Sequence, residues 1–411
     1  MNDIIIIGGG ISGLYCFYEL EKKYKHLKIS LFEKNNYFGG RFLTKTQTLF
    51  NKSYKTEIGA GRLNKNHTLF LKLIKELKLE KDLIKIKGNN DIHPSLDYNL
   101  NKKFKNKTSF DYIHKVIKKA EKENKKDLIK LSFKEYAQKI LKDDELKFLY
   151  DFSGYYGQLA FGNCYDVIKL FKYGIKENID YFVLKNGFSN IIEKLLKKIK
   201  SKNLYLKQEL FKINKFHNTF LLNINGYVYQ TKHLILALPK PALLKINYLN
   251  SYQKDLNSIN CKELCRIYSI FPKVWFKDLN KMTTNNKLRF IIPIDKQTGL
   301  IMISYTDSKY ANYWKKFINK PNKELVKEIN TQLTKIFPTK IEKPIYTSIY
   351  YWNCGVAYWK PKIDSDKMSE KILKLDINDN LYIIGENYSK NQSWAEGGLE
   401  TVNELLIKYK F

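Results

Sequence analysis

The sequence predicts an α/β protein whose parallel sheet begins at the first residues, and three observations support this. Residues 3–7 are a short apolar, β-branched run that suits a buried parallel strand and is too short to span a membrane. A glycine turn at residues 8–13 follows at once, and apolar residues then recur at helical spacing over residues 14–24. A second apolar run, residues 28–32, ends in Glu33. The order strand, glycine turn, helix, strand and acid is typical of a parallel sheet with crossover helices.

The glycine turn predicts a dinucleotide site. Its G-x-G-x-x-G spacing, with Gly8, Gly10 and Gly13, lets the chain turn tightly, lets backbone approach a pyrophosphate, and packs the helix against the strand. The positive N-terminal end of that helix favours phosphate. Glu33 follows the last glycine by about 20 residues, where a carboxylate can accept both hydroxyls of an adenosine ribose.

Composition indicates a folded protein of about two domains. The 411 residues are 44% hydrophobic and 14% aromatic, with a formal net charge of +32. Such a charge could attract nucleic acid, anionic lipid or acidic substrates. Because the lysines scatter through every segment instead of forming one stripe, we interpret the charge as surface composition and do not expect nucleic acid as the primary partner.

Arginine is rare in this lysine-rich chain. Of 73 basic residues only four are arginine, namely Arg41, Arg62, Arg266 and Arg289. A planar, forked donor cannot be replaced by an ammonium, so these positions are candidates for function.

Five cysteines, odd in number and irregularly spaced, show no disulfide framework and no second half of a zinc site. The six histidines are scattered, so no metal site is expected. No leader, apolar tail or membrane span is visible, and we expect a cytoplasmic protein without a membrane anchor.

The rest of the chain alternates helical and strand patterns. A polar insertion without clear periodicity is expected at 88–108. Helices are expected at about 67–79, at 110–120 (lysine-rich and exposed), at 132–141 (opened by a capping box) and from 144. Further helices are expected after a capping segment at 187–190, at 323–336 and near the C-terminus. Strands are expected at 204–206, 220–224, 227–230, 233–239, 266–271, 288–293, 300–305 and 381–386, with a hairpin turn at 225–226.

Five segments in this order resemble motifs of the FAD-containing amine oxidase superfamily: residues 38–41, 57–62, 352–359, 381–386 and 392–398. The resemblance implies a Rossmann-like FAD-binding domain, glutathione-reductase-like and of amine-oxidase type, with an inserted α+β substrate domain. It places the FAD domain at 1–79, 187–244 and 360–411. The substrate domain would be 80–186 and 245–359.

The resemblance also implies which residues hold the cofactor. They are Gly8, Gly10, Ile11, Ser12, Gly13, Glu33, Lys34, Gly40, Arg41, Gly59, Ala60, Gly61, Arg62, Leu210, Gly385, Glu386, Trp394 and Ala395. Where covalent relatives have a cysteine before the first cage aromatic this chain has Ala357, so FAD is expected to be non-covalent, although Cys354 is close in sequence. The superfamily's lysine near the flavin has no clean match, and Arg266 falls nearest.

Three residues are expected to act on the substrate. Arg62 resembles the arginine with which L-amino-acid oxidases clamp the substrate carboxylate, and a bidentate grip suits its geometry. Tyr358 and Trp394 resemble the two aromatics that flank the amine before the flavin. Each residue also has a plainer interpretation: Arg62 could pair with a nearby acid, and the aromatics could be ordinary core.

The implied reaction is oxidative deamination of an L-amino acid to a 2-oxo acid, ammonia and hydrogen peroxide, with molecular oxygen as acceptor. A polyamine or monoamine oxidase remains open, as do a flavin-dependent desaturase or isomerase and a basic binding protein that keeps FAD for stability. A small-molecule amine or amino acid is the expected partner, and a homo-oligomer is left open.

Overall fold

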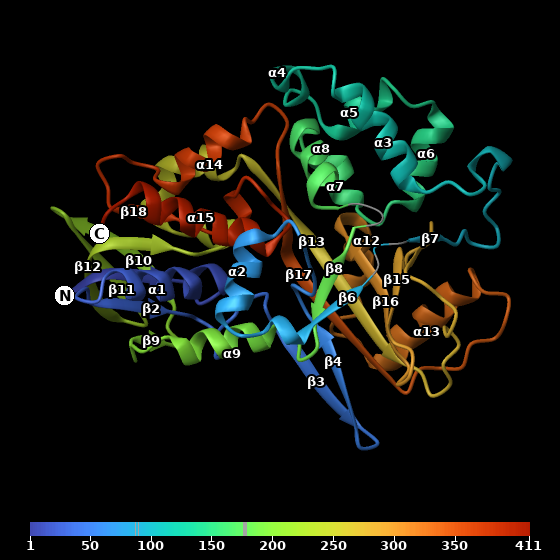
Figure 1. Ribbon diagram of the computed structural model, residues 1–411, viewed down its shortest axis with the longest axis horizontal. Coiled ribbons are helices and arrows are strands. Elements are labelled where there is room, and N and C mark those ends of the chain that lie inside the picture. Colours follow the sequence, from blue (N-terminus) through green and yellow to red (C-terminus); the bar gives the residue numbers. More distant parts are fainter. Residues whose placement is uncertain (87, 89, 176–178) are drawn as a thin grey trace.

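The computed structural model describes residues 1–86, 88, 90–175 and 179–411, and it contains two large sheets with helices around them (Figure 1). The predicted α/β class is confirmed. Among the described residues no helix is long and apolar enough to cross a membrane.

The first sheet is built around the N-terminal strand. Five of its strands are mutually parallel, in the order β18-β12-β1-β2-β9, and the hairpin β10–β11 joins it antiparallel through β12. The strands are β1 (Asn2–Ile7), β2 (Ile29–Phe32), β9 (Leu204–Tyr205), β10 (Leu210–Phe216), β11 (Thr219–Ile224), β12 (Tyr227–Leu236) and β18 (Leu381–Ile383).

The prediction of two strands at 227–230 and 233–239 is wrong, because β12 is continuous. Its polar centre suggested a break, but Thr231 is fully buried and its hydroxyl donates to backbone carbonyls of Asp3 and His233. At this point β12 leaves β11 and begins to pair with β1.

The two faces of β1 are both covered, which explains its unbroken apolar run. Ile4 and Ile6 pack with helices on one face, and Ile5 and Ile7 pack on the other face with the β10–β11 hairpin and short helices. The first group of helices is α1 (Ile11–Lys23), α2 (Thr68–Glu76), α9 (Ser189–Lys198) and α15 (Ala395–Lys408); the second is α10 (Lys240–Leu243), η3 (Asn247–Tyr252), α11 (Gln253–Leu256) and α14 (Ser365–Leu373).

The second sheet has the order β17-β13-β16-β15-β14-β7. Helices α12 and α13 pack against it. Its elements are β7 (Asp91–Ile92), β13 (Ile259–Ile270), β14 (Met282–Thr283), β15 (Phe290–Asp295), β16 (Leu300–Asp307), α12 (Ser308–Lys315), α13 (Asn322–Thr334) and β17 (Tyr346–Trp359). Strand β7 lies in the predicted polar insertion and pairs with β14, so that insertion is fixed to the sheet.

A block of helices with its own apolar core lies beside the second sheet (Figure 1). It contains η2 (Lys102–Phe104), α3 (Ser109–Ala120), α4 (Lys125–Leu128), α5 (Phe133–Gln138), α6 (Asp143–Phe152), α7 (Tyr156–Phe161) and α8 (Cys164–Tyr173). The capping box before α5 is confirmed, since Ser132 and Glu135 bond each other's backbone N–H. Helix α3 is not simply exposed: its apolar face is buried in this core and only its lysine-rich face meets solvent.

Small sheets connect these parts. The hairpin β3 (Thr44–Leu49) and β4 (Lys52–Glu57) precedes the motif at 57–62, and β8 (Tyr181–Leu184) pairs with both β5 (Leu63–Asn64) and β6 (Leu83–Ile86). Two short turns of helix, η1 (Glu80–Asp82) and η4 (Glu386–Tyr388), complete the elements. The domain boundaries given above stay a prediction.

The expectation of no disulfide is wrong. Cys261 of β13 and Cys354 of β17 form one, while Cys16, Cys164 and Cys265 are free and buried. The pair is 93 residues apart in sequence and meets only because β13 and β17 are neighbours, which spacing alone could not reveal.

Candidate active site

A cavity of about 730 Å³ is lined by the C-terminal ends of β1 and β2, by the residues that follow β12 in the first sheet, and by β13, β16 and β17 of the second. In a parallel sheet, loops after the carboxyl ends of the strands are where nucleotides bind. The cavity is large enough for an extended cofactor and brings together residues from nearly the whole chain.

The glycine turn forms one end of the cavity, and its glycines differ in what they do. A Cβ on Gly13 would lie 1.9 Å from the carbonyl oxygen of Gly8, so Gly13 allows α1 to approach β1, and it does not line the cavity. Gly10 lines the cavity, and a Cβ there would meet nothing within 4 Å. Open space beside a backbone turn at a helix N-terminus suits a phosphate group.

Glu33 lies buried at the end of β2, on the cavity wall. Its carboxylate accepts the backbone N–H of Gly9 at 2.7 Å and that of Asn35 at 2.8 Å. The side-chain amide of Asn35 also donates to it, at 2.7 Å. The three bonds fix the carboxylate and leave about one acceptor site free, because a carboxylate accepts about four hydrogen bonds. Its position fits the predicted role toward ribose hydroxyls.

Arg41 joins two motifs that lie far apart in sequence. Its guanidinium donates to the carbonyl oxygen of Gly355 at 2.8 Å and to the carboxylate of Glu386 at 2.8 Å. Glu386 is buried and also accepts the backbone N–H of Ser393 at 2.6 Å. The segments at 38–41, 352–359, 381–386 and 392–398 therefore meet at one place on the cavity.

Apart from Gly13, every residue predicted to contact cofactor or substrate lines this cavity. Besides those already described they are Gly8, Ile11, Ser12, Lys34, Gly40, Gly59, Ala60, Gly61, Arg62, Leu210, Tyr358, Gly385, Trp394 and Ala395. Their contacts with ligand stay predictions.

Arg62 has no acidic partner among the described residues, which argues against its plainer interpretation. Its guanidinium donates to the hydroxyl of Tyr155 at 2.7 Å. It also lies over the ring of Tyr181, 4.6 Å from the centroid, and 5.6 Å from that of Trp394. Burial, together with the charge of Arg62, lowers the pKa of nearby His67 to about 4, so the His67 imidazole is neutral at neutral pH. A half-buried cation held by aromatic groups can receive an anion.

Tyr358 and Trp394 both lie on the cavity wall, from β17 and from the N-terminal end of α15. Tyr358 is buried, and a Cβ on Gly157 would lie 3.1 Å from its hydroxyl, so α7 packs closely on it. Trp394 packs against His67, with ring centroids 4.6 Å apart, and stacks on Tyr181. The two rings are thus rigidly supported from outside the cavity.

Sequence reasoning left several cavity residues unassigned, namely Tyr155, Gln158, Arg266, Tyr305 and Asp307. Arg266 donates to the carbonyl oxygen of Glu57 at 2.9 Å and lies over Tyr305, and its Nε has no hydrogen-bond partner within the described ranges. Its rarity marked Arg266, but the others carry no signal in the sequence, since tyrosine is abundant and Asp307 belongs to no motif.

Asp307 is a fully buried carboxyl group on the cavity wall. Both its oxygens lie 3.0 Å from the backbone N–H of Gly157. Burial raises the pKa of Asp307 to about 7, although the Gly157 N–H and the charge of Arg289 both act to lower it. Asp307 can therefore hold or release a proton near neutral pH.

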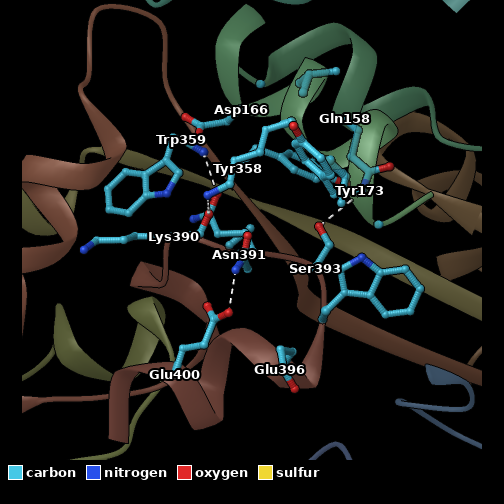
Figure 2. Close-up of a pocket in the computed structure, with 18 of the residues that line it drawn as sticks. Gln158, Asp166, Tyr173, Tyr358, Trp359, Lys390, Asn391, Ser393, Glu396 and Glu400 are labelled. Atoms are coloured by element: carbon cyan, nitrogen blue, oxygen red, sulfur yellow. Dashed lines mark hydrogen bonds between the residues drawn. The ribbon is translucent and has the colours of Figure 1, made fainter. Parts of the chain in front are cut away.

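A smaller pocket of about 120 Å³ shares part of the cavity wall (Figure 2). Gln158, Tyr358, Ser393 and Trp394 line both spaces, and Gln158 donates to the hydroxyl of Ser393 at 3.1 Å across the dividing wall. Figure 2 shows Asp166, Lys390 and Glu400 around this side pocket. Burial raises the pKa of Asp166 to about 6, while its hydrogen bonds to Ser365 and Asn163 hold it in place.

A flavin fits the residues of the large cavity on the geometry above. The glycine turn leaves open space at a helix N-terminus, Glu33 presents a fixed carboxylate at the end of β2, and Gly385 is in the left-handed region (φ 126°) with nothing within 4 Å of a Cβ. This fold and cavity suit the class of proteins that bind a large, phosphate-bearing cofactor.

Comparison with known proteins agrees with that class. The family model described as flavin containing amine oxidoreductase matches residues 11–401, and the chain belongs to this family. An uncharacterized protein of Acanthamoeba polyphaga mimivirus is 24% identical over 99% of this chain and 93% of its own length. A probable flavin-containing monoamine oxidase A of Dictyostelium discoideum is 23% identical over 60% of this chain and 59% of its own length.

Proposed function

We propose that the protein is an FAD-dependent oxidase of L-amino acids, which releases a 2-oxo acid, ammonia and hydrogen peroxide. The observation that carries this proposal is Arg62, a guanidinium on the cavity wall with aromatic partners and no carboxylate partner in the described part of the chain. A cation in this setting is stabilised by an incoming anion, and the group that distinguishes an amino acid from an amine is its carboxylate.

The cofactor proposal follows the predicted residues. The parallel sheet with its glycine turn would serve as a Rossmann-like, glutathione-reductase-like domain that holds the pyrophosphate at the N-terminus of α1 and the ribose at Glu33. Arg41 and Glu386 would support the middle of the molecule. Ala357 offers no nucleophile before Tyr358, so the flavin would be held without a covalent bond.

The protein's own residues would position the substrate. Arg62 would hold the carboxylate, and Tyr358 and Trp394 would flank the amine and exclude water. An amine must be neutral to be oxidised, and Asp307 is the buried carboxyl group suited to take the proton of the ammonium on an oxygen atom. The bound flavin supplies the electron sink for the hydride of the α-carbon. Molecular oxygen would reoxidise it.

A second candidate is an oxidase of simple amines. Two observations favour it: the relative from Dictyostelium discoideum carries the name of a probable monoamine oxidase, and the two aromatic side chains on the cavity wall suit any amine. In this case Arg62 would only support Tyr155.

Anaerobic mixing of the purified yellow protein with separate panels of L-amino acids and of mono- and polyamines tests the choice. We expect the visible absorbance of the oxidised flavin to be lost with amino acids and to persist with amines. Bleaching by amines alone would contradict the amino-acid proposal, and no bleaching by either panel would contradict amine oxidation altogether.

A further inference from the structure

The disulfide between Cys261 and Cys354 forms part of the wall of the large cavity. Cys354 lines the cavity, and Cys261 lies beside it on the neighbouring strand, with the two Cα atoms 5.1 Å apart. Both cysteines are only half-buried, whereas Cys16, Cys164 and Cys265 are fully buried. Of these five cysteines, only this pair is placed where a ligand of the cavity and an outside reagent can reach it.

The pair is directly connected to the residues proposed to hold the cofactor. The sulfur of Cys354 lies 3.7 Å, and that of Cys261 4.0 Å, from the side-chain oxygen of Asn387. The amide of Asn387 donates to Glu386 at 2.9 Å, and Glu386 in turn pairs with Arg41. Gly355, the residue after Cys354, accepts the other hydrogen bond of Arg41.

A purely structural crosslink does not explain this position well. Strands β13 and β17 already pair over most of their length, on both sides of a register shift between Lys262 and Leu264. A disulfide stabilises a fold mainly by constraining the unfolded chain, and that effect does not require the bond to face a cavity.

Lysine residues lie near Cys261, which Lys262 follows directly in the sequence. Lys240 donates to the carbonyl oxygen of Ile259, and its backbone N–H bonds to Asn387. Burial lowers the pKa of Lys240 to about 8, and the charges of Lys360 and Lys262 act in the same direction. The thiolate is the form that exchanges with disulfides, and a cation near a cysteine favours it over the thiol.

We propose that Cys261 and Cys354 are a redox-active pair that exchanges two electrons with the flavin, so that the protein oxidises dithiols as well as its amine substrate. An external dithiol attacks one sulfur of the disulfide; its second thiol then closes its own disulfide, and Cys261 and Cys354 leave as two thiols. When the pair closes again, the S–S bond forms and two electrons and two protons pass to the oxidised flavin. This inference relies on flavin binding but not on the identity of the amine.

Thiol counting tests the pair without any catalysis. In protein denatured under air, alkylation should label three cysteines, and five after reduction, whether or not flavin is present. Mass spectrometry should place the two additional labels at Cys261 and Cys354. Five labelled cysteines in the unreduced protein would overturn the proposal.

Reductive titration tests the electron transfer. Under anaerobic conditions the flavin-loaded protein should consume about two equivalents of dithionite per flavin, and the Cys261→Ser variant about one, because each centre takes two electrons. Cys265→Ser, on the same strand but facing the core, is the matched control and should keep two equivalents. One equivalent in the wild-type protein would overturn the proposal.

Dithiothreitol is the probe for the thiol activity. It should bleach the flavin anaerobically in the wild-type and Cys265→Ser proteins and at least about tenfold more slowly in Cys261→Ser, while the amine or amino acid found active above still bleaches all three. Equal rates with dithiothreitol in all three proteins would overturn the proposal. A protein that is inert to amines and amino acids would contradict the proposed function, but the expected numbers of dithionite equivalents for the wild type and Cys261→Ser would be unchanged.

Discussion

At the scale of single residues, the four arginines show how a guanidinium is used where lysine would fail. Arg41 bridges a carbonyl and a carboxylate, and Arg266 bonds a carbonyl beside Tyr305. Arg62 is held by aromatic groups, and Arg289 is fully buried against the carbonyl oxygens of Tyr150, Asp151 and Ser153. Their rarity identified all four as constrained, but only structure separates Arg289, a packing residue, from the three on the cavity.

Arg62→Lys should weaken the amino-acid substrate specifically. An ammonium cannot form the two parallel bonds to a carboxylate, so we expect the half-saturating substrate concentration for flavin reduction to rise by roughly 10- to 100-fold. Anaerobic stopped-flow measurement of flavin absorbance checks this. An unchanged half-saturation would show that Arg62 does not hold the carboxylate.

Arg289→Lys should instead weaken the fold. Several backbone carbonyls would lose their donors, at a cost of roughly 2–4 kcal/mol in the free energy of unfolding. Urea denaturation measures this loss. Wild-type stability in this variant would contradict the structural role.

Asp307 should make stability depend on pH. Its folded pKa of about 7 lies above the ordinary value of 3.8, so the folded state binds the proton more tightly and loses stability as pH rises from about 4 through 7. Asp307→Asn removes this titration while its oxygen can still accept the Gly157 N–H, so this variant should lose less stability over that range, by roughly 2–4 kcal/mol. The free energy of unfolding of both proteins, measured at pH 5 and pH 8, checks this. Equal losses of stability in the two proteins would contradict the role of Asp307.

At the scale of elements, the N-terminal unit was predictable because local rules determine it. A buried strand, a glycine turn and an amphipathic helix each have their own sequence pattern, and β1 and α1 appear where expected. The capping box before α5 is of the same kind. The hairpin β3–β4 and strand β7 could not be predicted, since their polar residues adopt extended structure through strand partners that the sequence does not reveal.

Two glycines of the turn should separate folding from cofactor binding. Gly13→Ala would place a methyl group 1.9 Å from the carbonyl oxygen of Gly8 and should destabilise the fold by roughly 2–4 kcal/mol. Gly10→Ala has open space and ordinary backbone angles, so its stability should change by about 1 kcal/mol or less. Its methyl group would instead enter the cavity.

Flavin content and thermal unfolding of the two variants measure the difference. Gly10→Ala should fold normally and retain little flavin. Full flavin retention in Gly10→Ala would mean that the phosphates lie elsewhere.

At the scale of the whole molecule, the cavity depends on segments distributed over the entire chain. The motifs predicted which segments belong together, because each must approach the same cofactor. They could not predict Tyr155, Tyr305 and Asp307, which reach the cavity only because β16 of the second sheet packs beside the N-terminal end of α7. They also could not predict that Cys261 and Cys354 would meet.

The net charge of +32 should matter little for turnover. An amino acid is a zwitterion without net charge, so long-range attraction contributes little to its binding. We expect the flavin reduction rate to change less than about threefold between 50 and 500 mM salt, whereas binding to a phosphate backbone would fall steeply. A steep loss of reduction rate with salt would point to a strongly anionic substrate instead.

We propose that the cavity oxidises an amine whose carboxylate is held by Arg62, and matched pairs of substrates are the sharpest test of this role. Each amino acid is compared with the amine that differs from it only by loss of the carboxylate, and anaerobic flavin reduction is measured for the wild type and Arg62→Met. We expect the wild type to reduce its flavin at least about 100-fold more efficiently with the amino acid, a difference of about 2.7 kcal/mol, and the variant to lose this preference. A wild-type preference for the amine, or a preference for the amino acid that survives in Arg62→Met, would contradict it.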